Sequence, residues 1–420
     1  QKESGEPAIS LVICPSSLVL NWEKEIERFA PEIKTLTVMG SAADRKEIIS
    51  KADEADVLIT SYELLKRDVL HYEPLSFYYE IIDEAQYIKN HNTQNAKAVK
   101  VINSKVRFAL TGTPVENSLA ELWSIYDYMM PGYLYTYRRF REKFEIPIVK
   151  SDDKKALSRL DRLVAPFILR RLKKDVLKEL PDKTETTMYA SLENEQKKLY
   201  LAHLIKSRES LESEFSGQDF ESKKLMILSM LTRLRQICCD PSLVYENYTS
   251  ESAKLELCLD LIESSINSGH KLLLFSQFTS MLEIIEKQLV ERKIEFYKIT
   301  GQTKAQERLR QVNAFNADDT PVFLISLKAG GTGLNLTGAD VVIHYDPWWN
   351  LSAQNQATDR VHRIGQKNSV QVYNLIAKDT IEEKIQQMQL AKAALADSII
   401  REGEGSIAKM SKDEIIRLFE

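Results

Sequence analysis

The run Leu272-Leu273-Leu274-Phe275 is apolar without interruption, as is typical of a strand that is buried on both faces of a parallel sheet. Comparable runs follow it at residues 296–299, 322–325, 341–343 and 370–373. An earlier set lies at residues 11–14, 57–60, 79–82 and 108–110. Because helical stretches separate the runs in both sets, we predict an α/β fold with two parallel-sheet domains covered by helices.

The division into domains follows from these two sets. A chain of 420 residues exceeds what one hydrophobic core usually organises. Between the sets, from about residue 118 to 265, the pattern becomes helical and polar and contains no convincing strand. We therefore predict a first domain at 1–117, helical insertions and a linker at 118–250, a second domain at 251–400 and a C-terminal helical tail at 401–420.

Composition and charge exclude several classes of protein. The chain is 43% hydrophobic and 28% charged, like ordinary globular proteins, and its net charge of −4 argues against wholesale coating by nucleic acid. Its apolar runs are far shorter than the roughly 18 residues of a membrane helix. The four cysteines lack metal-ligand spacing, and Cys238 and Cys239 are adjacent, which favours buried thiols in a reducing compartment. We expect no membrane partner and a cytoplasmic, nucleoid-associated location in a prokaryote, or a nuclear one in a eukaryote.

Two carboxylates follow the apolar run at 79–82, in the segment Asp83-Glu84-Ala85-Gln86. Chemistry in parallel α/β sheets lies at the carboxyl ends of strands, and isolated charges there must be hydrated, paired or bound to a cation. One carboxylate can hold Mg²⁺ through its water shell, while the next accepts a proton from an attacking water. Alternatively, the two acids cap the helix that follows.

Two further loops could contact phosphate. The run at 108–110 ends in Thr111-Gly112-Thr113-Pro114, where glycine permits a tight turn and the hydroxyl groups can contact a phosphate or relay to the acidic pair. The run at 322–325 leads to Lys328 and then to a glycine-rich loop at 329–335, whose backbone N–H groups can approach phosphate closely. Each loop, taken alone, is equally compatible with a simple strand-to-helix turn.

The strongest signal lies in Gln356-Ala357-Thr358-Asp359-Arg360-Val361-His362-Arg363-Ile364-Gly365-Gln366. Arg360 and Arg363 are three residues apart, so a helix would present both on one face. Two guanidinium groups aimed at one place suit a polyphosphate whose charge rises during phosphoryl transfer. Alternatively, the arginines pair with Asp359 or with other acids.

Taken together and in this order, these motifs resemble those of the Swi/Snf-type ATPases of helicase superfamily two. The segments that carry the resemblance are residues 11–17 with Trp22, 60–63, 83–86, 110–117, 167–171, 274–278, 299–301 with Arg308, 328–335, 344–350 and 360–366. The most specific are HYDPWWN at 344–350 and RVHRIGQ at 360–366, and the latter separates this family from ordinary unwinding helicases. The short insertions and the lack of an accessory chromatin-reading module favour a prokaryotic member.

The resemblance implies two RecA-like lobes that bind ATP and Mg²⁺ in their cleft and contact duplex DNA without sequence preference. The catalytic residues would be Asp83 at the metal ion, Glu84 at the attacking water, Gln86 as nucleotide sensor, and Arg360 and Arg363 as arginine fingers. Further nucleotide contacts would come from Thr111, Gly331, Gly333 and Gln356. The DNA track would include Ser16, Ser61, Gln277, Lys328 and Trp349. The resemblance also implies movement along duplex DNA without separation of the strands. A monomer is our default expectation, and DNA-bound protein complexes are further expected partners.

One departure from the family pattern concerns the phosphate-binding loop, which has the form GxxxxGK[ST] and should lie upstream of residue 11. None of the 14 glycines of the chain is followed by lysine. We expect that an N-terminal segment with this loop is absent from the sequence. The 420 residues alone should then bind ATP poorly and hydrolyse little of it.

Three functions therefore stay open. The first is an ATP-driven translocase on duplex DNA. The second is a nucleotide-inert DNA-binding or scaffold protein with a helicase-like shape, although such a protein has no physical need for the acidic pair and both arginines. The third is a strand-separating helicase, for which nothing resembles an unwinding pin. A Gly-Lys-Thr upstream of the sequence would favour the first function over the second.

Overall fold

The chain folds into two compact units that divide near residue 172. The computed structural model describes residues 9–112, 119–151, 153–169, 171, 177, 179–214, 220–330, 334–398 and 418. We call the units unit 1 (N-terminal) and unit 2 (C-terminal) and describe each by itself. Within these ranges, no helix is long and apolar enough to cross a lipid bilayer. Our finer division at residues 117, 250 and 400 stays a prediction.

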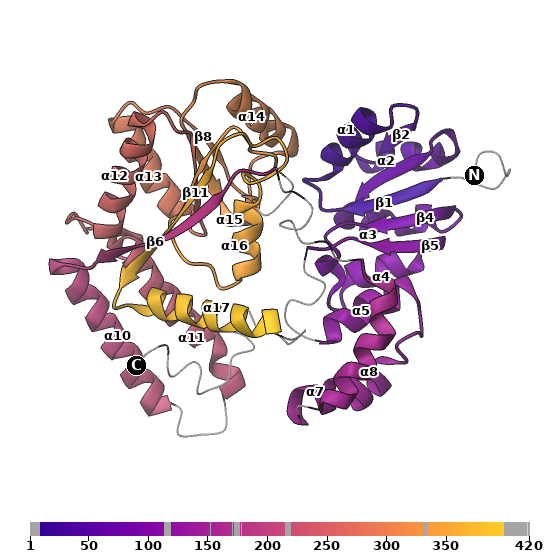
Figure 1. Ribbon diagram of the computed structural model, residues 1–420, viewed down its shortest axis with the longest axis horizontal. Helices are drawn as coiled ribbons and strands as arrows, with labels where there is room; N and C mark the ends of the chain where they lie inside the picture. The colour runs from indigo at the N-terminus through magenta and orange to yellow at the C-terminus, as the bar shows by residue number, and fades with distance from the viewer. Residues whose placement is uncertain are drawn as a thin grey trace. The chain divides into compact units, whose positions relative to one another are not determined.

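Unit 1 contains a parallel five-stranded sheet in the order β2-β3-β1-β4-β5 (Figure 1). Its strands are β1 (Ser10–Cys14), β2 (Thr35–Thr37), β3 (Val57–Ser61), β4 (Ser76–Ile82) and β5 (Asn103–Ala109). The apolar runs at 11–14, 57–60 and 79–82 all lie within strands of this sheet, as predicted. The short strand β2 is an addition that the sequence pattern did not reveal.

Helices cover both faces of this sheet because side chains alternate along each strand. In β1, Leu11 and Ile13 pack into the cluster beneath α2 to α5, whereas Val12 and Cys14 pack on the opposite side with Val19 of α1. The α-helices are α1 (Val19–Phe29), α2 (Ala42–Ser50), α3 (Tyr62–Tyr72), α4 (Gln94–Val101), α5 (Leu119–Met129), α6 (Tyr137–Phe140), α7 (Ile146–Ser151) and α8 (Lys154–Val164). Shorter helical turns are η2 (Ala52–Glu54), η3 (Ala85–Ile88), η4 (Arg141–Glu145) and η5 (Ala165–Phe167). Helices α5 to α8 also form a satellite core of their own.

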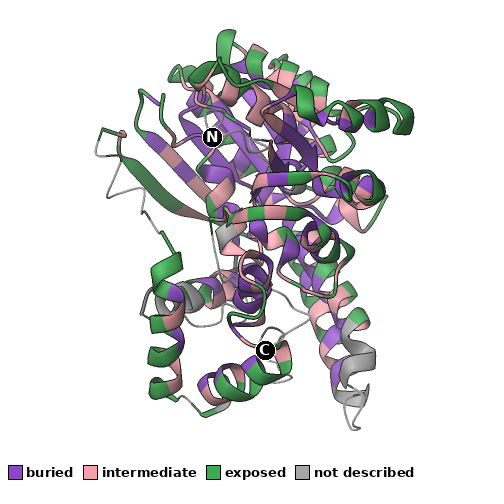
Figure 2. Cartoon of the chain, turned by 90° about the vertical axis from the view of Figure 1, so that its right-hand side faces the viewer, coloured by how far each residue is buried: buried purple, intermediate pink, exposed green. Residues whose placement is uncertain are grey.

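Unit 2 contains a parallel six-stranded sheet in the order β6-β11-β10-β7-β9-β8. Its strands are β6 (Lys183–Ser191), β7 (Leu272–Ser276), β8 (Phe296–Ile299), β9 (Val322–Ser326), β10 (Val341–His344) and β11 (Val370–Lys378). Its central strands β7, β9 and β10 are buried throughout. Along the chain as a whole, exposed residues gather on the outer faces of helices (Figure 2). Two parallel sheets with helices on both faces confirm the predicted fold class.

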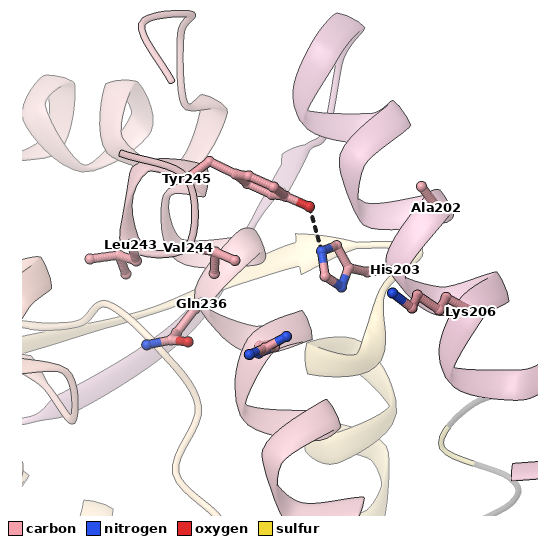
Figure 3. A pocket seen from close by; sticks show the side chains of 8 residues that line it. Ala202, His203, Lys206, Gln236, Leu243, Val244 and Tyr245 are labelled. Carbon is pink, nitrogen blue, oxygen red and sulfur yellow. Dashed lines mark hydrogen bonds between the residues drawn. The ribbon is translucent and has the colours of Figure 1, made fainter. Parts of the chain in front are cut away.

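The helices of unit 2 pack on both faces of its sheet. In β7, Leu273 and Phe275 face α14 to α16, whereas Leu272 and Leu274 face α12 and α13. The helices are α10 (Asn194–Glu214), α11 (Phe220–Cys239), η6 (Pro241–Leu243), α12 (Ala253–Asn267), α13 (Thr279–Glu291), α14 (Ala305–Ala317), α15 (Leu327–Gly330), α16 (Leu351–Thr358) and α17 (Ile381–Ser398). Helices α10 and α11 and the segment that begins with η6 line a pocket of about 510 Å³ (Figure 3).

The strand β6 contradicts our expectation that residues 118–265 contain no strand. It pairs with β11 in parallel along its whole length, from Lys183 beside Val370 to Ser191 beside Lys378. Six of its nine residues are exposed because it lies at the edge of the sheet. An edge strand of this kind needs no continuous apolar run, so its Lys-Thr-Glu-Thr-Thr sequence shows no strand pattern of the kind we used.

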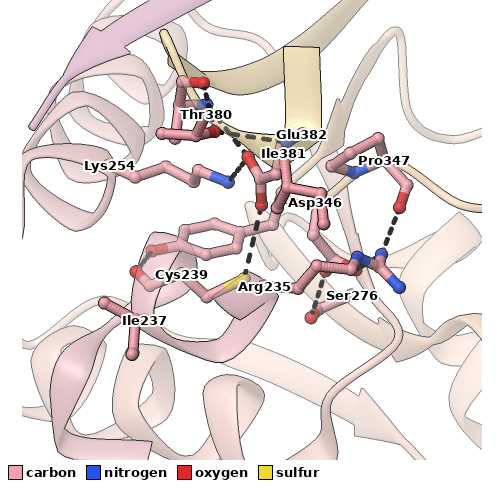
Figure 4. Close-up of polar contacts among 12 residues, drawn as sticks. Arg235, Ile237, Cys239, Lys254, Ser276, Asp346, Pro347, Thr380, Ile381 and Glu382 are labelled. Carbon is pink, nitrogen blue, oxygen red and sulfur yellow. Dashed lines mark hydrogen bonds and ion pairs between the residues drawn. The ribbon is translucent and has the colours of Figure 1, made fainter. Parts of the chain in front are cut away.

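A buried ion pair fixes two helices of unit 2 to the sheet. Lys254 of α12 and Glu382 of α17 bind each other with no exposed side-chain surface (Figure 4). The backbone N–H of Ala377 also donates to Glu382 at 2.9 Å, and the ring of Tyr345 lies 5.5 Å from the Lys254 ammonium group. Burial alone would lower the pKa of Lys254, but Glu382 beside it more than offsets this, so the net shift is upward.

The buried Glu80 of β4 predicts a pH dependence of the stability of unit 1. Burial raises its pKa from 4.5 to about 7, although Ser104 (2.7 Å) and Arg107 (3.1 Å) favour the charged form. Between pH 4.5 and 7 the folded state holds more protons than the unfolded state, so the free energy of unfolding should fall as pH rises, by up to about 3 kcal/mol.

The variant Glu80→Gln cannot titrate at this position and provides the comparison. Calorimetric unfolding at pH 5 and pH 8 should show that the variant gains stability relative to the parent chain at the higher pH. Two stability curves that stay parallel across this range would contradict the assignment of Glu80.

Candidate functional site

In unit 1, the register of β1 and β4 fixes the start of the acidic segment. Ile13 of β1 lies beside Ile82 of β4, and the backbone N–H of Asp83 donates to the Ile13 carbonyl at 2.8 Å. One carboxylate oxygen of Asp83 accepts a hydrogen bond from the Trp22 indole at 2.9 Å, and the other accepts from the Glu84 N–H at 2.8 Å. The Asp83 carboxylate is therefore held in one orientation at the carboxyl end of β4.

A line of hydrogen bonds connects Glu84 to the end of β5. Thr111 donates to the Gln86 side-chain carbonyl at 3.2 Å, and the Gln86 amide donates to Glu84 at 2.6 Å. The backbone of Glu84 is left-handed, with φ of 52°, which costs a non-glycine residue about 1–3 kcal/mol. Glu84 begins the turn η3 without capping it through its side chain, so the structure does not support the alternative in which this acid serves as a cap.

Two uncharged side chains, Tyr62 and Cys14, lie near Asp83. The Tyr62 hydroxyl donates to the Asp83 backbone carbonyl at 2.8 Å, and burial followed by the nearby Asp83 charge raises the pKa of Tyr62 well above its usual value. The same two causes raise the pKa of Cys14. Both groups therefore stay protonated at physiological pH.

These residues fit a magnesium ion. Each Asp83 oxygen accepts one hydrogen bond and keeps a further lone pair, and both Asp83 and Glu84 are partly exposed. The described ranges contain no group of three or more His, Cys, Asp or Glu side chains that could enclose a metal ion. Mg²⁺ is usually held by one or two carboxylates together with water and substrate phosphates, so a site with few protein ligands matches its chemistry.

Two predicted DNA contacts of unit 1 lie at the carboxyl ends of the paired strands β1 and β3. Ser16 is exposed in the turn after β1. Ser61 is buried, and its hydroxyl caps α3 by accepting a hydrogen bond from the Leu64 N–H at 3.3 Å. Ser16 lies just after β1 and Ser61 is the last residue of the adjacent β3, so both are at one edge of the sheet, while Ser61 is positioned to orient α3.

In unit 2, the ends of β7 and β10 are joined by Asp346. This buried carboxylate accepts hydrogen bonds from the Ser276 hydroxyl at 2.6 Å and from the Gln277 N–H at 3.2 Å. Burial raises the pKa of Asp346, while Arg235 acts in the opposite direction. The loop that carries Trp349 is thereby fixed beside Gln277, so the structure brings two of the predicted DNA contacts to one place.

Arg235 of α11 completes this arrangement. The sequence analysis did not predict a role for this residue. Its guanidinium group donates to Gln277 at 3.0 Å and to the Pro347 carbonyl, and lies 3.5 Å from Asp346 (Figure 4). It also lies 5.4 Å from the centre of the Trp349 ring. A signal was present in the sequence, because Arg235 falls on the buried stripe of α11 with Leu231 and Cys238, where an apolar residue is expected.

The segment that carries both arginines differs from our expectation. Helix α16 ends at Thr358, so Arg360 and Arg363 lie in the turns beyond it and not on one face of a helix. The Arg360 carbonyl accepts a hydrogen bond at 3.1 Å from the N–H of Leu336, a residue that lies outside this segment. The N–H groups of residues 360–362 still bond to Ala357 and Thr358, but beyond them a tertiary hydrogen bond at the Arg360 carbonyl takes the place of a helical one.

Buried polar residues fix these turns at both ends. His344 of β10 bonds to Thr358 at 2.9 Å, and burial lowers the pKa of His344 to about 3, with Lys183 acting in the same direction, so its ring is neutral. Gln366 donates to the Ala339 carbonyl at 2.7 Å, and His362 bonds to the Pro181 carbonyl at 2.8 Å. The short RVHRIGQ segment is therefore held by at least three separate parts of unit 2.

The remaining predicted residues are only partly described. Gln356 is half-buried on α16. The backbone of Lys328 lies in α15, directly after β9, and nothing is described of its side chain. Gly331 and Gly333 lie outside the described residues. The predicted roles of these four residues stay predictions.

Comparison with known proteins places this arrangement in a family. Residues 1–243 match the family model of the SNF2-related domain, and residues 253–365 match the helicase conserved C-terminal domain. The chain therefore belongs to the SNF2-related family, as its motifs predicted, and its two units correspond to the RecA-like lobes expected of that family.

Relatives occur in bacteria and in yeast. The chain is 39% identical over 415 residues to the uncharacterized ATP-dependent helicase MG018 of Mycoplasma genitalium, and the match covers 98% of this chain and 39% of that protein. It is 32% identical to the TATA-binding protein-associated factor MOT1 of Saccharomyces cerevisiae, over 98% of this chain and 25% of MOT1. The chain thus spans less than half the length of these two relatives.

Among solved structures, the SWI2/SNF2 ATPase core of Sulfolobus solfataricus in complex with dsDNA is 38% identical to the chain. The match covers 99% of this chain and 87% of that structure, with a TM-score of 0.48.

The position of Arg235 generates a prediction about stability. The change Arg235→Gln leaves Asp346 buried without its cation, which should lower the free energy of unfolding by about 3–5 kcal/mol. Arg233→Gln is a matched control on the same helix, because Arg233 is exposed, and its effect should stay within about 0.5 kcal/mol. Denaturant unfolding followed by circular dichroism measures both variants, and equal losses would contradict the assigned role.

Proposed function

We propose that this chain is the motor of an ATP hydrolase that moves along duplex DNA without separating its strands and without sequence preference. The observation that carries the proposal is the hydrogen-bonded line from Thr111 through Gln86 to Glu84, next to the oriented carboxylate of Asp83. Membership of the SNF2-related family supports it.

The acidic segment would carry out the proton chemistry. ATP would supply the transferred phosphoryl group, and Mg²⁺ would neutralise charge on its phosphates. Asp83 would hold the metal ion, and Glu84 would accept the proton of the attacking water. Gln86 bonds to both Glu84 and Thr111. A nucleotide bound at Thr111 would therefore shift Gln86 and, through it, the general base Glu84.

Arg360 and Arg363 would stabilise the charge that develops on the phosphates, as arginine fingers contributed by unit 2. Gln356, Gly331 and Gly333 are proposed as further nucleotide contacts. The fixation of the arginine segment by His344 and Gln366 supports this proposal, because a catalytic arginine must be positioned before the reaction starts.

Duplex DNA would be held through its phosphates, which gives affinity without sequence preference. The proposed contacts are Ser16 and Ser61 in unit 1 and Gln277, Lys328 and Trp349 in unit 2. The cluster around Arg235 and Asp346 supports the unit 2 contacts, since it positions Gln277 and Trp349 together. We further propose a monomer that acts on DNA-bound protein complexes, in the cytoplasm of a prokaryote or the nucleus of a eukaryote.

A second candidate is a nucleotide-inert DNA-binding or scaffold protein. The observation that favours it is the lack of any Gly-Lys pair in the 420 residues, because the lysine of the phosphate-binding loop grips the β- and γ-phosphates. We propose accordingly that these 420 residues alone hydrolyse little ATP, and that activity requires such a loop.

The two candidates differ in DNA-stimulated turnover. In the natural gene product that contains these 420 residues, duplex DNA should raise the rate of ATP hydrolysis at least about fivefold, because DNA bound across both units favours the catalytic state. A phosphate-release assay with and without a duplex of random sequence measures this. Equal rates under both conditions would favour the nucleotide-inert protein.

The arginines provide a second test in the same gene product. Arg360→Ala or Arg363→Ala should each lower turnover by roughly 10³-fold or more, while DNA affinity changes little. Arg310→Ala is the control, because Arg310 lies on α14 and pairs with the neighbouring Glu307 at 2.9 Å. If turnover in the two test variants survived within a few-fold of the control, both residues would have to be reassigned to structural ion pairs.

A further inference from the structure

A basic pocket on the helical side of unit 2 lies outside every motif used above. Its volume is about 510 Å³, within the range of sites for small ligands. Three elements contribute to it: α10, α11 and the segment that begins with η6 (Figure 3). Its charged lining residues are Lys206 of α10 and Arg233 of α11, and none of its lining residues is a carboxylate.

The two cations of this pocket differ from the paired surface cations of the chain. Lys198, on the same helix, pairs with Glu195 three residues earlier at 2.9 Å. Lys206 also has an acid three residues away, Glu209, yet the two form no ion pair. Within the described residues, neither Lys206 nor Arg233 has a carboxylate partner. Two positive charges from different helices therefore face one pocket without neutralisation.

The other lining groups add donors and a flat apolar surface. The His203 ring bonds through Nε2 to the Tyr245 hydroxyl at 2.5 Å (Figure 3). Burial lowers the pKa of His203, and Arg233 and Lys206 act in the same direction. The Gln236 amide is a further donor, while Val244 and the Tyr245 ring offer apolar surface.

We propose that this pocket binds a phosphate monoester that carries a flat organic group, such as a nucleoside monophosphate. A monoester carries about two negative charges near neutral pH, which match Lys206 and Arg233. The planar guanidinium group fits phosphate oxygens in a bidentate manner, and an aromatic ring such as Tyr245 can stack with a base. The ligand is either a free mononucleotide or the phosphorylated end of a nucleic-acid strand, because both present this group.

The test uses AMP as the probe and the imidazole resonances of His203 as the readout, assigned with His203→Gln. AMP should shift these resonances in a saturable manner. Lys206→Gln and Arg233→Gln should each weaken the affinity roughly tenfold or more, because each removes a charge-assisted contact. Lys198→Gln is the matched control on α10 and should leave the affinity unchanged.

Further experiments distinguish a free mononucleotide from a strand end as the ligand. They also test whether AMP binds at the proposed catalytic site instead. Displacement of AMP by a 5′-phosphorylated oligonucleotide, but not by its unphosphorylated form, would support the site with a strand end as its source. Failure of both to displace AMP would support the site with a free mononucleotide. Absence of a saturable shift, equal affinity in all the lysine and arginine variants, or loss of binding in Arg360→Ala would overturn the proposal.

Discussion

The parallel direction of every strand is the constraint on which the rest of the structure depends. In a parallel sheet all strands end at the same edge, so segments far apart in the chain meet there without any contact between their sequences. In unit 1 this brings Asp83 after β4 next to the end of β1 and places Thr111 after β5 beside Gln86. In unit 2 it brings Gln277 after β7 beside Asp346 after β10.

Buried polar groups then fix the positions of the side chains at the strand ends of unit 2. The Lys254–Glu382 pair and the Arg235–Asp346 pair both lie between the sheet of unit 2 and its helices. Charges this well buried are costly unless each is paired and hydrogen-bonded, so they tolerate few alternative arrangements. The geometry of Gln277 and Trp349 therefore depends on α11, a helix that carries no catalytic motif. Mutations in α11 should thus be judged by their effect on this geometry as well as on stability.

The sequence predicted those parts of the fold that follow from local pattern. Strands such as β7 were evident because a strand buried on both faces must be apolar throughout. The sequence analysis did not predict the edge strand β6. This strand contributes mainly backbone hydrogen bonds, which do not depend on amino-acid composition. The same contrast holds for the candidate site. Asp83 and Glu84 could be predicted because they follow an apolar strand directly. The role of Arg235 and the non-helical turn at Arg360 arise from tertiary hydrogen bonds that no spacing rule contains.

Two acids, one within β4 and one directly after it, show how the surroundings of similar side chains determine their properties. Glu80 is buried in the middle of the strand, where desolvation raises its pKa to about 7 even with Arg107 beside it. Asp83 stands three residues later at the strand end, partly exposed, with two N–H donors on its carboxylate. The end of the strand thus leaves its carboxylate in contact with solvent and fixed by two hydrogen bonds, whereas the middle encloses one. A strand end therefore supplies what a metal ion needs, a carboxylate in a fixed orientation within reach of water.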